Sequence, residues 1–299
     1  MKPREWALFW ALGLIWGSSF LWIKIGVQEL DPFTLVGWRL FFGTVGMVAV
    51  LLWRRPPFPR KKSTWVALAA LGIINTALPF VLITWGEQSI DSAVASVLNS
   101  TVPLFTLVIA HLFLRDEPIT ARRSAGLLIG FAGVLILMAR DLRLDNLRLG
   151  LLGQGAVLLA AVSYAAASVF ARRTMREVSP LVQAFVPMAF ADALVWSIAT
   201  QAGDPGRLPT LTSTWMALLW LGLLGSCIAY LIYYSLLHSV GATRATMVTY
   251  VFPVVGVALG VVFLHERADW HLLAGAALVV SSIAVVNWKP RATVSVAAD

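Results

Sequence analysis

Residues 64–85 read TWVALAALGIINTALPFVLITW, an apolar run that contains no Asp, Glu, Lys or Arg. Charged residues bound the run, with Lys61 and Lys62 before it and Glu87 after it. A helix of about 20 apolar residues is long enough to cross the roughly 30 Å hydrocarbon layer of a bilayer. The stretch therefore predicts a transmembrane helix.

Similar runs follow one another along the whole chain. Of its 299 residues, 59% are hydrophobic and only 13% are charged, whereas a soluble domain carries about 25% charged residues. The mean hydropathy is +0.81. The pattern predicts an all-α polytopic membrane protein with ten transmembrane helices, near residues 6–27, 33–53, 64–85, 91–113, 122–139, 150–171, 180–200, 214–236, 243–264 and 269–288.

The opening stretch has a counterpart about 150 residues later, and other pairs follow in the same order. The matched pairs are Trp65 with Trp215, Leu71-Gly72 with Leu221-Gly222, Ser89 with Ser239, Ala95 with Ala245, Pro103 with Pro253, and Phe113-Leu114 with Phe263-Leu264. Each half holds five spans, so the second copy enters the membrane from the opposite face. We predict two inverted five-helix repeats, over residues 1–140 and 150–290, with a short cytoplasmic tail at 291–299. Inverted repeats are typical of carriers that work by alternating access.

The distribution of positive charge predicts the orientation. Sixteen of the 23 lysines and arginines fall at the N-terminus, at the C-terminus and in every second connection, and only five fall in the opposite set. Because basic connections stay in the cytoplasm, both termini are predicted to be cytoplasmic. The formal net charge of +8 is explained by this topology, so it does not indicate a nucleic-acid partner.

Three pairs of glycines are spaced by four residues: Gly13 and Gly17, Gly126 and Gly130, and Gly256 and Gly260. Small residues at this spacing allow close contact between membrane helices. We interpret the pairs as helix contacts, either within a repeat or between the two.

Short motifs in corresponding places carry a family resemblance. They are Trp16-Gly17-Ser18-Ser19-Phe20 followed by Lys24; Arg39; Pro103, Phe113-Leu114, Glu117, Gly126 and Gly133; and, in the second half, Pro253, Phe263-Leu264, Glu266 and Gly275. With the five-plus-five spans, the sequence resembles the drug/metabolite transporter superfamily, specifically its EamA-like ten-helix exporters. The resemblance implies export of small metabolites, often amino acids or related amphiphiles, across a bacterial inner membrane. The halves differ where Tyr164-Ala165, Arg172 and Pro187 stand opposite Trp16-Gly17, Lys24 and Arg39.

Asp192 is predicted to lie near the middle of the bilayer, about 18 Å into its span at 1.5 Å per residue. Ionisable groups at membrane depth are costly unless they face protein or water, so they are candidates for function. We interpret Asp192 as a candidate proton-coupling carboxylate whose pKa is raised by desolvation. The alternative is a structural carboxylate that is solvated or paired with a neighbouring helix.

Lys24 and Arg39 are predicted to lie at similar depths, within about two turns of the outer boundary. They could hold a substrate carboxylate or form an outer gate with Glu29, Asp31 or Glu87. The alternative is snorkelling to the interface or fixed pairing between helices.

A cavity wall is predicted from polar and aromatic residues within the spans. Its members are Trp16, Asn75, Trp85, Asn99, Ser100, Thr101, Tyr164, Tyr230, Thr249 and Tyr250. Such a lining suits an amphiphile whose polar head needs a few hydrogen bonds. The alternative is that these groups bond between helices or face lipid.

No cofactor or metal is predicted. His265-Glu266 is followed by His271 at a spacing that does not match a zinc protease, Cys227 is the single cysteine, and no Gly-Lys-Ser/Thr phosphate loop is present. The leading hypothesis is a secondary transporter that exports small metabolites, driven by proton exchange or by the substrate's own gradient. The alternative is a membrane-embedded lipid-modifying transferase. The expected partners are a small-molecule substrate, the lipid bilayer and protons, and the sequence is compatible with a monomer.

Overall fold

The computed structural model describes residues 2–113, 120–140, 147–175, 177–206, 208–240 and 247–287. Over these ranges the chain folds into α-helices with short π- and 3₁₀-helical segments and no strand. The all-α prediction is confirmed. The helical segments are α1 (Pro3–Gly26), α2 (Pro32–Arg54), α3 (Lys62–Gly72), η1 (Ile73–Ala77), α4 (Leu78–Gly86), α5 (Ser92–Asn99), α6 (Val102–Phe113), α7 (Ala121–Arg140), α8 (Leu147–Thr174), α9 (Pro180–Ala202), α10 (Thr212–Leu219), η3 (Trp220–Ile228), α11 (Ala229–Val240), η4 (Met247–Tyr250), α13 (Val251–Leu264) and α14 (Trp270–Asn287).

These segments fall where the hydropathy placed the spans. Eight helices among the described residues are long and apolar enough to cross a membrane, and two shorter apolar helices, Val248–Leu264 and Trp270–Val286, occupy the ninth and tenth positions. Several spans are built from more than one element: α3, η1 and α4 are continuous, as are α10, η3 and α11. Of the predicted ninth span, residues 243–246 lie outside the described residues.

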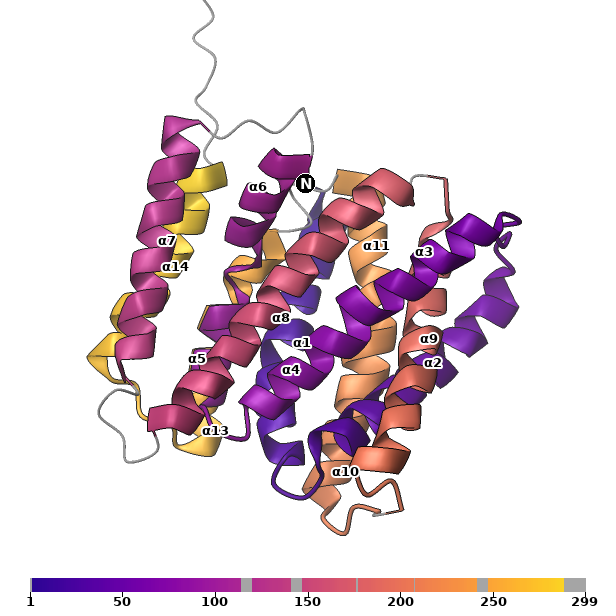
Figure 1. Cartoon of the computed structure of the whole chain (residues 1–299), viewed down its shortest axis with the longest axis horizontal. Helices are drawn as coiled ribbons and strands as arrows, with labels where there is room; N and C mark the ends of the chain where they lie inside the picture. The colour runs from indigo at the N-terminus through magenta and orange to yellow at the C-terminus, as the bar shows by residue number, and fades with distance from the viewer. Residues whose placement is uncertain are drawn as a thin grey trace, which may run out of the picture.

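The helices run alternately between two faces of the bundle (Figure 1). We name the faces as the view shows them: α1 begins and α14 ends at the upper face, and the connecting residues 27–31, 87–91, 203–206, 208–211 and 265–269 lie at the lower face. The first helix of each half, α1 and α8, runs in opposite directions. Opposite directions are expected, because a repeat with an odd number of spans begins and ends on different faces.

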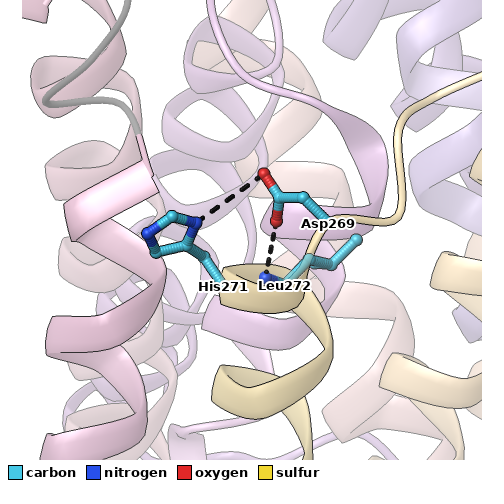
Figure 2. Close-up of polar contacts among 3 residues, drawn as sticks. All are labelled: Asp269, His271 and Leu272. Carbon is cyan, nitrogen blue, oxygen red and sulfur yellow. Dashed lines mark hydrogen bonds and ion pairs between the residues drawn. The ribbon is translucent and has the colours of Figure 1, made fainter.

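Local chemistry determines where several helices begin. Asp31 accepts hydrogen bonds from the backbone N–H groups of Phe33 and Thr34, at 3.0 and 3.1 Å, and Pro32 is the first residue of α2. At α14, Asp269 Oδ1 accepts a hydrogen bond from Leu272 N at 2.9 Å, and its other oxygen lies 3.9 Å from His271 Nδ1 (Figure 2). Such caps satisfy N–H groups that have no partner within the helix.

The glycine pairs lie at contacts between the two halves. A Cβ atom on Gly13 would lie 2.9 Å from Val251 Cβ, and one on Gly17 would lie 2.7 Å from Val255 Cβ, so α1 packs directly on α13. The other pairs behave alike: Gly126 and Gly130 of α7 contact Ser282 of α14, whereas Gly256 and Gly260 of α13 contact Ser96 and Ser92 of α5. The interpretation of these motifs as helix contacts is confirmed, and all three contacts join different halves.

The packing at Gly17 yields a stability prediction. We expect Gly17→Ala to lower the free energy of unfolding by about 1–3 kcal/mol, the usual cost of inserting a group into a filled contact. Thermal unfolding in detergent measures the change. Gly155→Ala is the matched control, because a Cβ at Gly155 of α8 meets no atom within 4 Å and alanine favours a helix. Equal melting temperatures for the two variants would contradict the packing described here.

Candidate functional site

The third span of each half contains a π-helix in the same place. η1 covers Ile73–Ala77, and residues 223–227, at the 150-residue offset, fall within η3 (Trp220–Ile228). A π-helix is often found at functional sites because its wider turn disturbs the regular ladder of hydrogen bonds. Both segments lie within the bundle, away from the ends of their spans.

Carbonyl groups of the two π-helices accept hydrogen bonds from the opposite half. Trp16 Nε1 of α1 donates to the Gly225 carbonyl at 3.0 Å. In the other direction, Ser163 Oγ of α8 donates to the Ile74 carbonyl at 2.6 Å. The first helix of each half thus bonds to the π-helix of the other, although the donor and the acceptor of the second bond each lie one residue before the repeat equivalents of those in the first.

Aromatic rings surround Trp16. Its ring centroid lies 5.9 Å from Tyr230, 5.5 Å from Tyr233 and 6.2 Å from Phe252, and Tyr234 lies 5.4 Å from Tyr233. We call these five residues the aromatic cluster. Rings with polar tips present both apolar surface and hydrogen-bonding groups, which fits the apolar part of an amphiphile.

Arg39 of α2 lies buried beside this cluster, only 5% exposed. Its guanidinium carbon lies 3.7 Å from the centroid of the Phe80 ring, and Nε donates to Ser226 Oγ of η3 at 3.2 Å. Within the described residues no carboxylate lies at ion-pair distance, so the guanidinium can accept an anionic group from elsewhere.

Lys24 of α1 has a different environment from Arg39. Its Nζ donates to the carbonyls of Glu87 and Ile90, at 2.6 and 2.7 Å, in the connection between α4 and α5. The Glu87 side chain is fully buried, and neither of its carboxylate oxygens has a hydrogen-bond partner. Glu87 was one of the three acids predicted to form an outer gate with Lys24. Its backbone carbonyl, and not its carboxylate, bonds to Lys24.

The other two gate candidates join the halves at the lower face. Glu29 accepts hydrogen bonds from Thr210 Oγ1 and Thr210 N, both at 2.6 Å, and from Leu211 N at 3.3 Å. These bonds, led by that of the Thr210 hydroxyl, lower the pKa of Glu29 to about 2. For Asp31, burial alone would raise the pKa, but hydrogen bonds from Thr34, Asp204 and Phe33 outweigh it and hold the pKa below its usual value.

Asp192 lies apart from Arg39. It is half-buried in the middle of α9, beside Thr44 of α2 and Trp196 of its own helix, and its Oδ1 is buried without a hydrogen-bond partner. The contacts of Arg39 are instead with Phe80 and Ser226. The structure therefore keeps the candidate proton site and the candidate anion site separate.

The remaining predicted wall residues divide by what their polar atoms do. Ser100 and Thr101 are fully buried, and their hydroxyls donate at 2.6 Å to the Val97 and Leu98 carbonyls of their own segment. Asn99 is 7% exposed and its Oδ1 has no partner. Four others are half-buried: Asn75 in η1, Tyr164 in α8, and Thr249 and Tyr250 in η4. Trp85 is 40% exposed.

Four residues that contact Arg39 or Trp16 were not identified from the sequence. They are Phe80, Ser226, Tyr233 and Phe252. The sequence holds 15 phenylalanines and five tyrosines, so no single ring is distinctive. The repeat offset could have located Ser226, because it aligns with Thr76 next to Asn75 in η1.

Comparison with known proteins identifies relatives over nearly the full length. The sequence profile of the EamA-like transporter family matches residues 5–139 and 151–288. The chain is 28% identical to the uncharacterized transporter YoaV of Bacillus subtilis, over 90% of this chain and 92% of that one. It is 34% identical to the uncharacterized inner membrane transporter YedA of Escherichia coli K12, over 87% and 82%. A solved crystal structure, 22% identical, covers 96% of this chain and 98% of its own with a TM-score of 0.69, which shows a shared fold.

The bond between α8 and η1 can be tested with a minimal substitution. We expect Ser163→Ala to lower the free energy of unfolding by about 0.5–1.5 kcal/mol, the net value of one hydrogen bond, as measured by thermal unfolding in detergent. Ser168→Ala on the same helix is the control, because its hydroxyl is exposed and bonds to the Ala165 carbonyl of its own helix. A loss of stability in Ser168→Ala as large as that in Ser163→Ala would contradict a specific role for the contact between the halves.

Proposed function

Because the chain belongs to the EamA-like transporter family, we propose that it is a secondary transporter that exports small metabolites, amino acids or related amphiphilic compounds. Its relatives are membrane transporters of the drug/metabolite type. Membership of a transporter family sets aside the alternative of a membrane-embedded lipid-modifying transferase.

The observation that carries the substrate proposal is the buried guanidinium of Arg39, which has no carboxylate partner among the described residues. A buried charge without a partner is costly, and a substrate carboxylate would supply that partner. The aromatic cluster and Tyr164 would receive the apolar part of the same molecule. An amino acid with an apolar side chain combines both features.

Alternating access is supported by the way the halves meet. Each half contributes a first helix and a π-helix to a pair of matched hydrogen bonds around this site. We propose residues 1–140 and 150–290 as the two units that move relative to each other. At the lower face, Glu29 bonds to Thr210, Asp204 N donates to Asp31, and Lys24 bonds to the connection 87–91. These contacts support the proposal that the lower face is the closed end.

We further propose that the upper face is cytoplasmic and the lower face is outside the inner membrane. The asymmetry of the Lys and Arg residues supports this orientation, which places both termini and the tail 291–299 in the cytoplasm. The relative YedA is named as an inner membrane transporter. The driving force is either proton exchange, for which Asp192 is the candidate carboxylate, or the substrate's own gradient.

Transport assays with Arg39 variants test the anion site. In reconstituted vesicles we expect counterflow of at least one radiolabelled amino acid, and Arg39→Gln should weaken its apparent affinity about tenfold to a hundredfold, as loss of a charged hydrogen bond of about 1.5–3 kcal/mol implies. Arg39→Lys should retain part of the affinity, because it keeps the charge.

Asn75→Ala and Asn99→Ala extend that test to the predicted wall. They should change apparent affinity more than protein abundance. Counterflow of no amino acid and no amphiphilic cation in a broad panel would count against a carrier.

Asp192→Asn tests proton exchange separately. If Asp192 carries the coupled proton, the variant should lose transport driven by a pH gradient while it retains substrate counterflow, which needs no proton. Vesicles with an imposed pH gradient measure both quantities. An unchanged pH profile in Asp192→Asn would assign Asp192 a structural role.

A further inference from the structure

Glu87 is a buried acidic group at the end of α4, and the proposed transport of substrate does not use its side chain. It follows directly after the last residue of α4, at the lower face, and its side chain is fully buried. Neither carboxylate oxygen accepts a hydrogen bond. Buried carboxylates are normally paired or bonded, because an isolated charge in an apolar environment is strongly disfavoured.

The surroundings of Glu87 disfavour its charged form. Carbonyl groups at the end of a helix carry partial negative charge, and the two of this connection that lie nearest, those of Glu87 and Ile90, already bind the Lys24 ammonium. On the side of α8, Gly153 and Val157 contact Gly86 and cannot titrate. Among the described residues, none donates a hydrogen bond to the Glu87 carboxylate.

The other charged groups near Glu87 have partners of their own. The Glu266 carboxylate accepts hydrogen bonds from Ser92 N and Ala93 N, at 2.7 and 2.9 Å, and Asp91, in the same connection, also has a partner. Burial raises the pKa of Glu87 well above its ordinary value; Lys24 and Arg39 oppose this effect and Glu266 adds to it.

We propose that Glu87 is a proton-binding site, which takes up one proton from water at the lower face when that face closes and releases it when the face opens. The step is a simple protonation, in which a carboxylate and a proton form a neutral carboxyl group. This inference rests on the proposed alternating-access function and adds the group that makes closure depend on pH. It is distinct from Asp192, which lies in the middle of α9 against α2.

The contacts around Glu87 explain why closure and protonation would go together. Lys24 of α1 holds the connection 87–91 from one side, and Glu266 of the second half holds the start of α5 from the other. Because the Glu87 side chain is fully buried, opening of one of these contacts would admit water to its carboxyl group. Deprotonation therefore favours the open lower face, and uptake of one proton changes the ratio of open to closed molecules by up to tenfold per pH unit.

The distance between two spin labels at the lower face tests the proposal in the full-length protein in lipid vesicles. Gln28→Cys and Ala268→Cys, both exposed, place one label on each half, on the connections after α1 and before α14, in a Cys227→Ser background that removes the single native cysteine. We expect the long-distance, open population to grow with pH in the parent protein. Glu87→Gln, which mimics the protonated group, should stay closed at every pH, whereas Glu87→Asp should keep a pH response.

Infrared spectroscopy provides a measurement that is independent of the spin labels. Protein labelled with ¹³C-glutamate should show a shifted band from a protonated carboxyl group at a pH where the lower face is closed, and Asp192→Asn should retain that band. Absence of the band from the closed protein would overturn the proposal. So would a pH response of the label distance that is equal in the parent and in Glu87→Gln, or one that disappears in Asp192→Asn instead.

Counterflow in the same vesicles separates this inference from the proposed function. Vesicles without counterflow that retain a Glu87-dependent change in distance would overturn the transport proposal and leave the proton site in place. Normal counterflow with an unchanged pH response in Glu87→Gln would overturn the proton site alone.

Discussion

Within the hydrocarbon layer no water is available for the backbone, so its N–H and C=O groups must find partners inside the protein. The two halves satisfy this constraint largely through each other. Trp16 and Ser163 bond to carbonyls of the opposite π-helix, and Glu266 bonds to N–H groups at the start of α5. The interface is therefore polar where helices are interrupted and filled with small residues where they are continuous.

The same constraint explains why the halves are related but not equivalent. A tryptophan N–H makes the bond from α1, whereas a serine hydroxyl makes the corresponding bond from α8. Arg39 itself has Pro187 as its repeat counterpart, so only one half supplies a buried cation. The site is consequently one-sided within a nearly symmetric frame.

The spans were predictable because hydropathy responds directly to the bilayer, and the inversion followed from the odd number of spans in each repeat. Arg39 and Trp16 were predictable as a charge and a large ring at membrane depth. Their contacts were not, because Arg39 meets Ser226 across 187 residues of sequence and both π-helices look like ordinary apolar helix in the sequence. Lys24 and Arg39 were predicted to lie at similar depths in the bilayer. Depth along a helix does not determine which neighbouring helix a side chain faces, so their different contacts could not be predicted.

Arg39 and Glu87 are close enough for their charges to interact, yet each lacks a partner of opposite charge at ion-pair distance within the described residues. A direct pair would satisfy both groups and would leave neither of them available to a ligand. Buried groups held unpaired reduce stability, and proteins retain such groups chiefly where function requires them. Separation of the guanidinium from the carboxyl leaves one group free for an anion and the other for a proton. Both groups belong to the first half and lie beside residues of the second, Ser226 near Arg39 and Glu266 near the start of α5. A movement of one half against the other would therefore affect both ligands.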